Sequence, residues 1–105
     1  MPILKNEPTL KDIQMYVKEL ERERGFTDVS IIQNCLLLGE EVGELFKAIR
    51  KIEKMKTDFN SNFTSVEEEL ADIMIFISSI ANQYNINLET AFRNKEEINK
   101  KRQWN

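Results

Sequence analysis

An apolar stripe at helical spacing runs through residues 31–52 and limits the chain to a helical architecture. The stripe recurs every three or four residues, as one face of an α-helix does. Its members are Ile31, Cys35, Leu38, Val42, Leu45, Ile49 and Ile52. The chain of 105 residues holds only two prolines and three glycines, so long helices meet few breaks. We therefore predict an all-α, four-helix bundle-like fold in a single domain over residues 1–105.

Capping residues and periodicity together place the ends of the helices. Thr9 suits the N-cap of a first helix, and Gly25 suits its end. Ser65 followed by Glu68 matches a capping box at the start of the third helix. After a loose lead-in at 1–8, the expected helices cover 10–24, about 31–54 behind a cap at Asp28 or Ser30, about 65–84 and about 88–102.

The residue types present exclude several kinds of chemistry. The chain has no histidine, which excludes Ser-His and Cys-His catalysis and the usual zinc sites. Its one cysteine, Cys35, cannot form an internal disulfide and is expected to be a small buried hydrophobe. With no transmembrane-length segment or signal peptide, a cytoplasmic location is expected. A formal charge of −3 with mixed signs predicts no nucleic-acid polymer as partner. The lack of a transmembrane-length segment predicts no membrane partner.

Two acidic pairs lie on the second and third expected helices. Glu41 and Glu44 are three residues apart, as are Glu69 and Asp72, so each pair points roughly the same way. At about 100° per residue, Glu41 and Glu69 fall beside the apolar stripes, at the edge of the core. Buried carboxylates need a partner, and one or two Mg²⁺ ions, with Mn²⁺ as a substitute, would provide it.

Another interpretation of these four acids is a salt-bridge network at the edge of the core. Metal binding is favoured because the acids cluster and no basic residue interleaves with them on that face. Three further acids, Glu40, Glu67 and Glu68, are expected to be solvated helix charges instead.

The fourth helix carries a Lys, an amide and an Arg on one face. Lys95, Asn99 and Arg102 recur at helical spacing beyond Leu88 and Phe92. Beside a carboxylate–metal centre they would suit phosphate oxygens. Ordinary basic residues near a helix C-terminus would give the same pattern, and spacing alone does not separate the two interpretations.

The third helix is apolar around most of its circumference. One face carries Val66, Leu70, Ile73, Ile77 and Ile80, and Met74, Ile75 and Phe76 extend it. A helix that is apolar on nearly all sides is buried on nearly all sides, which a domain of this size cannot easily achieve alone. A homodimer or a larger even assembly such as a tetramer is therefore expected, the alternative being a central helix in a monomer.

Three of these elements together resemble a known family. Glu40-Glu41-Val42-Gly43-Glu44 resembles the E-E-x-x-E motif of the MazG-like, all-α nucleoside triphosphate pyrophosphohydrolases, and Glu69-Leu70-Ala71-Asp72 resembles their E-x-x-D motif. The stretch from Lys95 through Asn99 to Arg102 resembles their K-x-x-x-N-x-x-R signature. The similarity runs from about residue 33 to the C-terminus, and the first helix fits by position only.

The resemblance implies a hydrolase that works as a dimer or tetramer and cleaves a nucleoside triphosphate to the monophosphate and pyrophosphate, in control of the nucleotide pool. Carried over by motif, the metal ligands are Glu41, Glu44, Glu69 and Asp72, and the substrate-binding residues are Lys95, Asn99 and Arg102. We expect Glu41 or Glu44 to accept the proton of the attacking water, with Glu40 as the second candidate. Phe76 is expected to line the nucleotide pocket unless it is a core aromatic. Trp104 would cap that pocket or pack on the surface.

Two other functions remain open from the sequence. One is a non-enzymatic, dimeric helical module whose acids bind a regulatory metal or a basic partner. The other is a pyrophosphohydrolase of a different phosphorylated substrate, such as phosphoribosyl-ATP.

Overall fold

The computed structural model describes residues 1–58 and 64–103, and within these ranges the chain is helical without strands. The helices are α1 (Leu10–Arg24), α2 (Ile31–Ile52), α3 (Val66–Gln83) and α4 (Leu88–Lys100). The all-α prediction is confirmed. The second and fourth helices each end two residues earlier than expected, at Ile52 and Lys100. Trp104 lies outside the described residues.

Local capping chemistry sets the helix ends much as the sequence predicts. The Thr9 hydroxyl accepts from Asp12 N at 3.1 Å, and Thr9 N donates back to Asp12 Oδ2 at 2.9 Å. Gly25 ends α1 at φ 74°, a left-handed conformation that favours glycine. At α3 only half of the predicted box forms. The Ser65 hydroxyl accepts from Glu68 N, but the Glu68 carboxylate accepts from that hydroxyl rather than from the Ser65 backbone.

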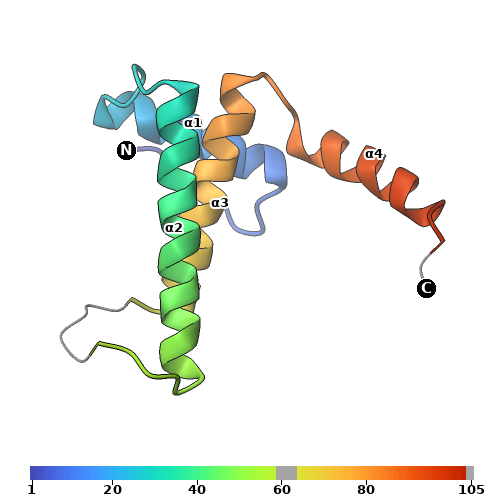
Figure 1. The fold of residues 1–105 in the computed structure, drawn as a ribbon. Coiled ribbons are helices and arrows are strands. Elements are labelled where there is room, and N and C mark those ends of the chain that lie inside the picture. Colours follow the sequence, from blue (N-terminus) through green and yellow to red (C-terminus); the bar gives the residue numbers. More distant parts are fainter. Residues whose placement is uncertain (59–63, 104–105) are drawn as a thin grey trace.

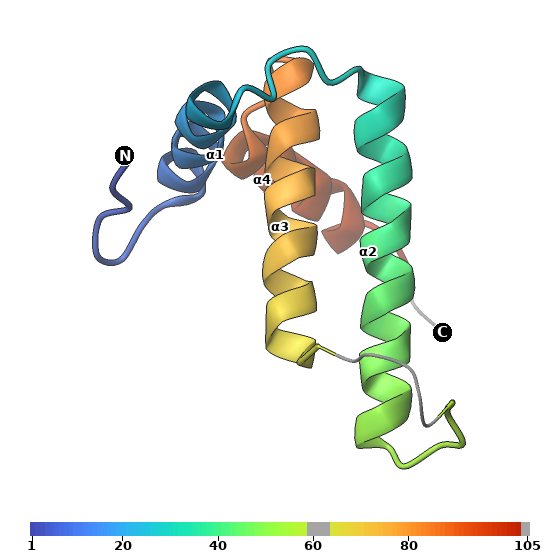
Figure 2. The same ribbon diagram turned by 90° about the vertical axis from the view of Figure 1, so that its left-hand side faces the viewer.

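The antiparallel pair α2–α3 is the centre of the fold. Figures 1 and 2 show the two helices side by side along most of the length of α3, with α1 packed against the C-terminal part of α3. The helix α4 contacts α1 and leads away from the pair. The radius of gyration is 16.5 Å, whereas a compact chain of this length has about 13 Å. The single chain is therefore open, and much of its helical surface is uncovered.

A hydrogen-bonded clamp on α1 sets where α4 begins. The Gln14 side chain is 6% exposed. Its Nε2 donates to Ile86 O at 2.8 Å, and its Oε1 accepts from Leu88 N at 2.9 Å. The Asn82 amide donates to Gln14 O at 2.9 Å. Because the bonds to Ile86 O and Leu88 N satisfy backbone groups of the turn between α3 and α4, α1 fixes the start of α4.

The core of the single chain is small and partly polar, which corrects one expectation. Its buried apolar residues are Val17, Leu20, Ala48 and Ala81, and its buried polar residues are Gln14, Asn34, Glu69, Ser78 and Ser79. Cys35 is exposed, so the prediction of a buried thiol is wrong for this chain. Ile49 and Ile52 of the predicted stripe are also exposed. The reason is that α2 turns Asn34 and Ala48 inward, which leaves much of its large apolar surface outward.

None of the helices in the described parts of the chain is both long enough and apolar enough to cross a membrane.

Candidate active site

Three of the four predicted metal ligands meet between α2 and α3. Glu41 comes from α2, and Glu69 and Asp72 come from one face of α3. One carboxylate oxygen from each lies within 4.8 Å of the others. The antiparallel packing of the two helices produces this meeting, because it places the middle of α2 opposite the first turns of α3. This geometry and donor set suit a hard divalent cation.

Glu69 is the most buried member of the cluster. Its side chain is 3% exposed, and the Thr64 hydroxyl donates to its Oε1. Its Oε2 is buried and accepts no hydrogen bond from the described residues. A buried carboxylate oxygen without a partner costs free energy of about 1–3 kcal/mol or more. The ion pairs Lys5–Asp12, Arg93–Glu89 and Lys100–Glu97 lie elsewhere. A bound cation is the simplest partner for this oxygen.

The crowding of carboxylates raises the pKa of Glu41 to about 7, from an ordinary 4.5. The largest cause is hydrogen bonding to Glu69, since a protonated Glu41 can donate to it; burial and the charges of Glu69, Asp72 and Glu44 follow. Glu44 lies outside the group of three but is close enough for its charge to act on Glu41. Without a cation, the cluster therefore tends to keep a proton near neutral pH.

This raised pKa predicts how the stability of the metal-free protein changes with pH. Between the unfolded-state pKa of 4.5 and the folded-state pKa of about 7, the folded state binds more protons than the unfolded state. The free energy of unfolding therefore falls as pH rises through this range. We expect the metal-free Tm to be lower at about pH 8 than at about pH 5.5, and added Mg²⁺ to raise it more at about pH 8.

Thermal scans at both pH values, with chelator and with Mg²⁺, would measure this effect. Glu41→Gln cannot ionise and should reduce the pH difference. A metal-free Tm that rises from the lower to the higher pH, with the wild type and Glu41→Gln behaving alike, would contradict the electrostatic account.

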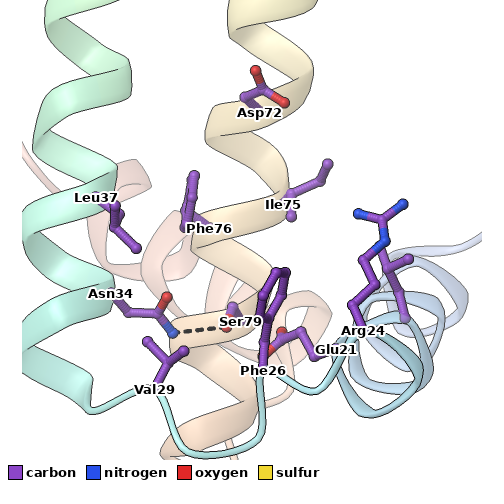
Figure 3. A pocket seen from close by; sticks show the side chains of 11 residues that line it. Glu21, Arg24, Phe26, Val29, Asn34, Leu37, Asp72, Ile75, Phe76 and Ser79 are labelled. Atoms are coloured by element: carbon purple, nitrogen blue, oxygen red, sulfur yellow. Dashed lines mark hydrogen bonds between the residues drawn. The ribbon is translucent and has the colours of Figure 1, made fainter.

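A cavity of about 380 Å³ opens beside the acidic cluster. It lies between α2, α3 and the end of α1, and Asp72 belongs both to its lining and to the group of three acids. Phe76 also lines it, one turn after Asp72 on α3 (Figure 3), where the sequence analysis expected a nucleotide pocket. The rest of the lining is mostly apolar, as is usual for small-molecule sites.

The structure does not bring the basic residues of α4 to the acids of the same chain. Lys95, Asn99 and Arg102 lie on or just after a helix whose main contact is with α1. The Asn99 amide donates to Glu96 of its own helix at 2.9 Å. A role for these three residues in substrate binding therefore remains a prediction, and it requires a second copy of the chain or a movement of α4.

The sequence analysis missed Asn34, which is 4% exposed and lines the cavity. It lies seven residues before Glu41, hence two turns away on the same face of α2. A polar residue among apolar neighbours at that spacing was the available signal.

Comparison with known proteins shows the family of this chain. The family model described as "MazG nucleotide pyrophosphohydrolase domain" matches residues 29–104. Human dCTP pyrophosphatase 1 is 31% identical over an alignment that covers 91% of this chain. The chain spans 59% of the length of that relative.

Two crystal structures of iMazG from Vibrio DAT 722, with the tag at the C-terminus or the N-terminus, are also similar. Each is 33% identical, with a TM-score of 0.62 over 88% of this chain; the match covers 98% and 94% of the respective iMazG chains. The family expected from the three motifs is thus confirmed: this chain belongs to the MazG nucleotide pyrophosphohydrolase domain family.

Proposed function

We propose that this domain is a Mg²⁺-dependent nucleoside triphosphate pyrophosphohydrolase that releases the nucleoside monophosphate and pyrophosphate. The observation that carries this proposal is the buried Glu69 Oε2, which lacks a partner among the described residues and lies in a cluster of three carboxylates. The adjoining cavity supplies room for the nucleoside. Family membership supports the reaction class, and a dCTP-cleaving relative makes deoxynucleoside triphosphates the first substrates to test.

In this proposal the carboxylates hold the ion and manage the proton of the attacking water. Glu41, Glu69 and Asp72 would bind the cation directly, because their oxygens already converge. When bound, Mg²⁺ would neutralise phosphate charge and lower the pKa of a coordinated water. Glu44 stands outside the group of three yet close to Glu41, which suits it to accept the water's proton. Phe76 would contact the nucleoside from the cavity wall.

We further propose that two or more copies assemble through an exposed stripe on α2. Its members, which we call the α2 outer stripe, are Ile32, Leu36, Gly39, Gly43 and Phe46, and they follow a 4-3-4-3 spacing along one face. Ile32, Leu36 and Phe46 are 72%, 70% and 59% exposed. A methyl group added at Gly39 or Gly43 would have no neighbour within 4 Å in the part of the chain that the structure describes.

Glycine within a helix is destabilising by about 0.5–1 kcal/mol relative to alanine. The presence of two glycines in one helical stripe therefore requires an explanation. Nothing in the described chain supplies it, but a second helix in close approach would. Such an assembly would also cover apolar surface left open by the extended shape. A second copy is in addition the simplest source of Lys95, Asn99 and Arg102 for the acidic cluster.

A panel of nucleotides incubated with Mg²⁺, with detection of released pyrophosphate, tests the proposed function. Canonical and damaged dNTPs and phosphoribosyl-ATP belong in the panel. We expect release of pyrophosphate from at least one of them and none when the metal is chelated. If no compound is cleaved while Mg²⁺ still binds, the domain is a metal-binding interaction module instead.

A further inference from the structure

The cavity beside the acidic cluster has two chemically different ends. Figure 3 shows Asp72 at one end, Asn34 and Ser79 at the other, and Phe76 between them. Asn34 lies seven residues from Glu41 along α2, a rise of about 10 Å. This is the kind of span a nucleoside covers between the edge of its base and its first phosphorus. A nucleotide with its phosphates at the acids would therefore direct the edge of its base toward Asn34.

Asn34 is held in one orientation by two hydrogen bonds. Its Nδ2 donates to Ser79 Oγ at 2.8 Å and to Gln83 Oε1 at 2.9 Å. The side chain is 4% exposed, so these bonds form in a largely buried setting. Its Oδ1 accepts a hydrogen bond from none of the described residues. The amide therefore presents, at the wall of the cavity, an acceptor without a partner among the described residues.

A backbone carbonyl fixes the direction of this network. Gln83 Nε2 donates to Val29 O at 2.8 Å. Because a carbonyl can only accept, Gln83 must turn its nitrogen to Val29 and its oxygen to Asn34. Asn34 must then turn its nitrogen to Gln83. Rotating the Asn34 amide would place two acceptors against each other, so Oδ1 is the atom that remains for a ligand.

We propose that Asn34 Oδ1 accepts a hydrogen bond from the amino group at C4 of cytosine or C6 of adenine, so that the site selects these bases over uracil, thymine, hypoxanthine or guanine. This inference rests on the proposed function, because it uses the acids to orient the phosphates. Uracil, thymine, guanine and hypoxanthine carry a carbonyl where cytosine or adenine carries the amino group. A carbonyl there would oppose the Asn34 oxygen, and an acceptor left without a donor should cost about tenfold to hundredfold in affinity.

Binding of deoxynucleoside monophosphates tests this selection without relying on hydrolysis. Calorimetry with Mg²⁺ present would compare dCMP with dUMP, and dAMP with dIMP, because each pair differs in the amino-to-carbonyl exchange. We expect at least one amino-bearing partner to bind at least about tenfold more tightly than its carbonyl counterpart. The two pairs also distinguish whether the cavity takes a pyrimidine, a purine or both.

Three variants assign the selection to Asn34. Asn34→Leu removes the acceptor and should bring the affinity ratio to within about twofold. Gln83→Met keeps Asn34 but frees its amide to turn, so the ratio should also fall. Asn6→Leu makes the same chemical change at an exposed position in the N-terminal segment and should leave the ratio unchanged. Far-UV circular dichroism would confirm that each variant is folded.

The outcomes separate this inference from the proposed function. Equal affinities, tighter binding of the carbonyl-bearing partners, or no binding of any of the four would overturn the role of Asn34. So would a folded Asn34→Leu protein with the wild-type ratio. Selective binding of dCMP or dAMP without release of pyrophosphate from any triphosphate would instead overturn the proposed function and leave the base selection standing.

Discussion

Glu69→Gln should lower kcat/KM for pyrophosphate release by at least about a hundredfold, a loss typical of removing one major electrostatic element from an active site. Glu69 is the most buried acid of the cluster, and its Oε2 has no partner among the described residues. The substitution keeps the size of the side chain but removes its charge. Because it also relieves the repulsion with Glu41, the metal-free Tm should rise while the increase caused by Mg²⁺ should shrink.

Glu67→Gln is the matched control for that experiment. Glu67 is exposed in the same first turn of α3, so the same chemical change should leave hydrolysis and the response to Mg²⁺ unaltered. Steady-state kinetics and thermal scans on both variants would measure the difference. Normal hydrolysis by a folded Glu69→Gln protein would show that the metal assignment is wrong.

Gly39→Leu should convert the assembled protein into monomers and reduce activity by at least about a hundredfold, if α4 of another copy supplies cationic groups to the site. No atom of the described residues lies within 4 Å of the new Cβ, so the variant should not clash within one chain. Leucine also favours helix over glycine by up to about 1 kcal/mol. The loss of assembly should therefore occur without loss of helicity, as sedimentation and circular dichroism would show.

Gly25→Ala serves as the control, because it should lower stability without affecting assembly. Gly25 has φ 74°, where a side chain costs about 1 kcal/mol, but it lies at the end of α1 and away from the α2 outer stripe. It should lower the free energy of unfolding and leave the sedimenting mass unchanged. A wild-type protein that is monomeric and active, or a Gly39→Leu protein that still assembles, would refute the proposed interface.

Much of the fold could be predicted from the sequence because local interactions define it. Thr9 and Gly25 delimit α1 through hydrogen bonds and backbone conformation within a few residues of the chain. The face on which α2 packs is less local. The periodicity predicted a stripe through Cys35 and Ile49, but both are exposed in the single chain. Periodicity identifies an apolar face without saying whether it packs within the chain or against another copy.

The candidate site could likewise be predicted from the sequence only in part. Helical spacing placed Glu41 and Glu69 at the edge of the core, and the three converging carboxylates agree with that geometry. The network that orients Asn34 could not be foreseen, because it joins α2, α3 and a backbone carbonyl brought together only by folding. Whether α4 reaches the acids likewise depends on packing between helices, within one chain or between copies, which the spacing of Lys95 and Asn99 does not encode.

The hydrogen bonds of Gln14 fix the start of α4, and α4 then leads away from the α2–α3 pair of its own chain. If copies of the chain associate as proposed, each reaction centre draws its acids from one polypeptide and its basic groups from a neighbour. Two inactive variants could then be mixed, one with a substituted acid in the cluster and the other with a substituted basic residue of α4. The mixture would regenerate some intact reaction centres. Turnover would depend on protein concentration, with dilution alone acting as an off-switch.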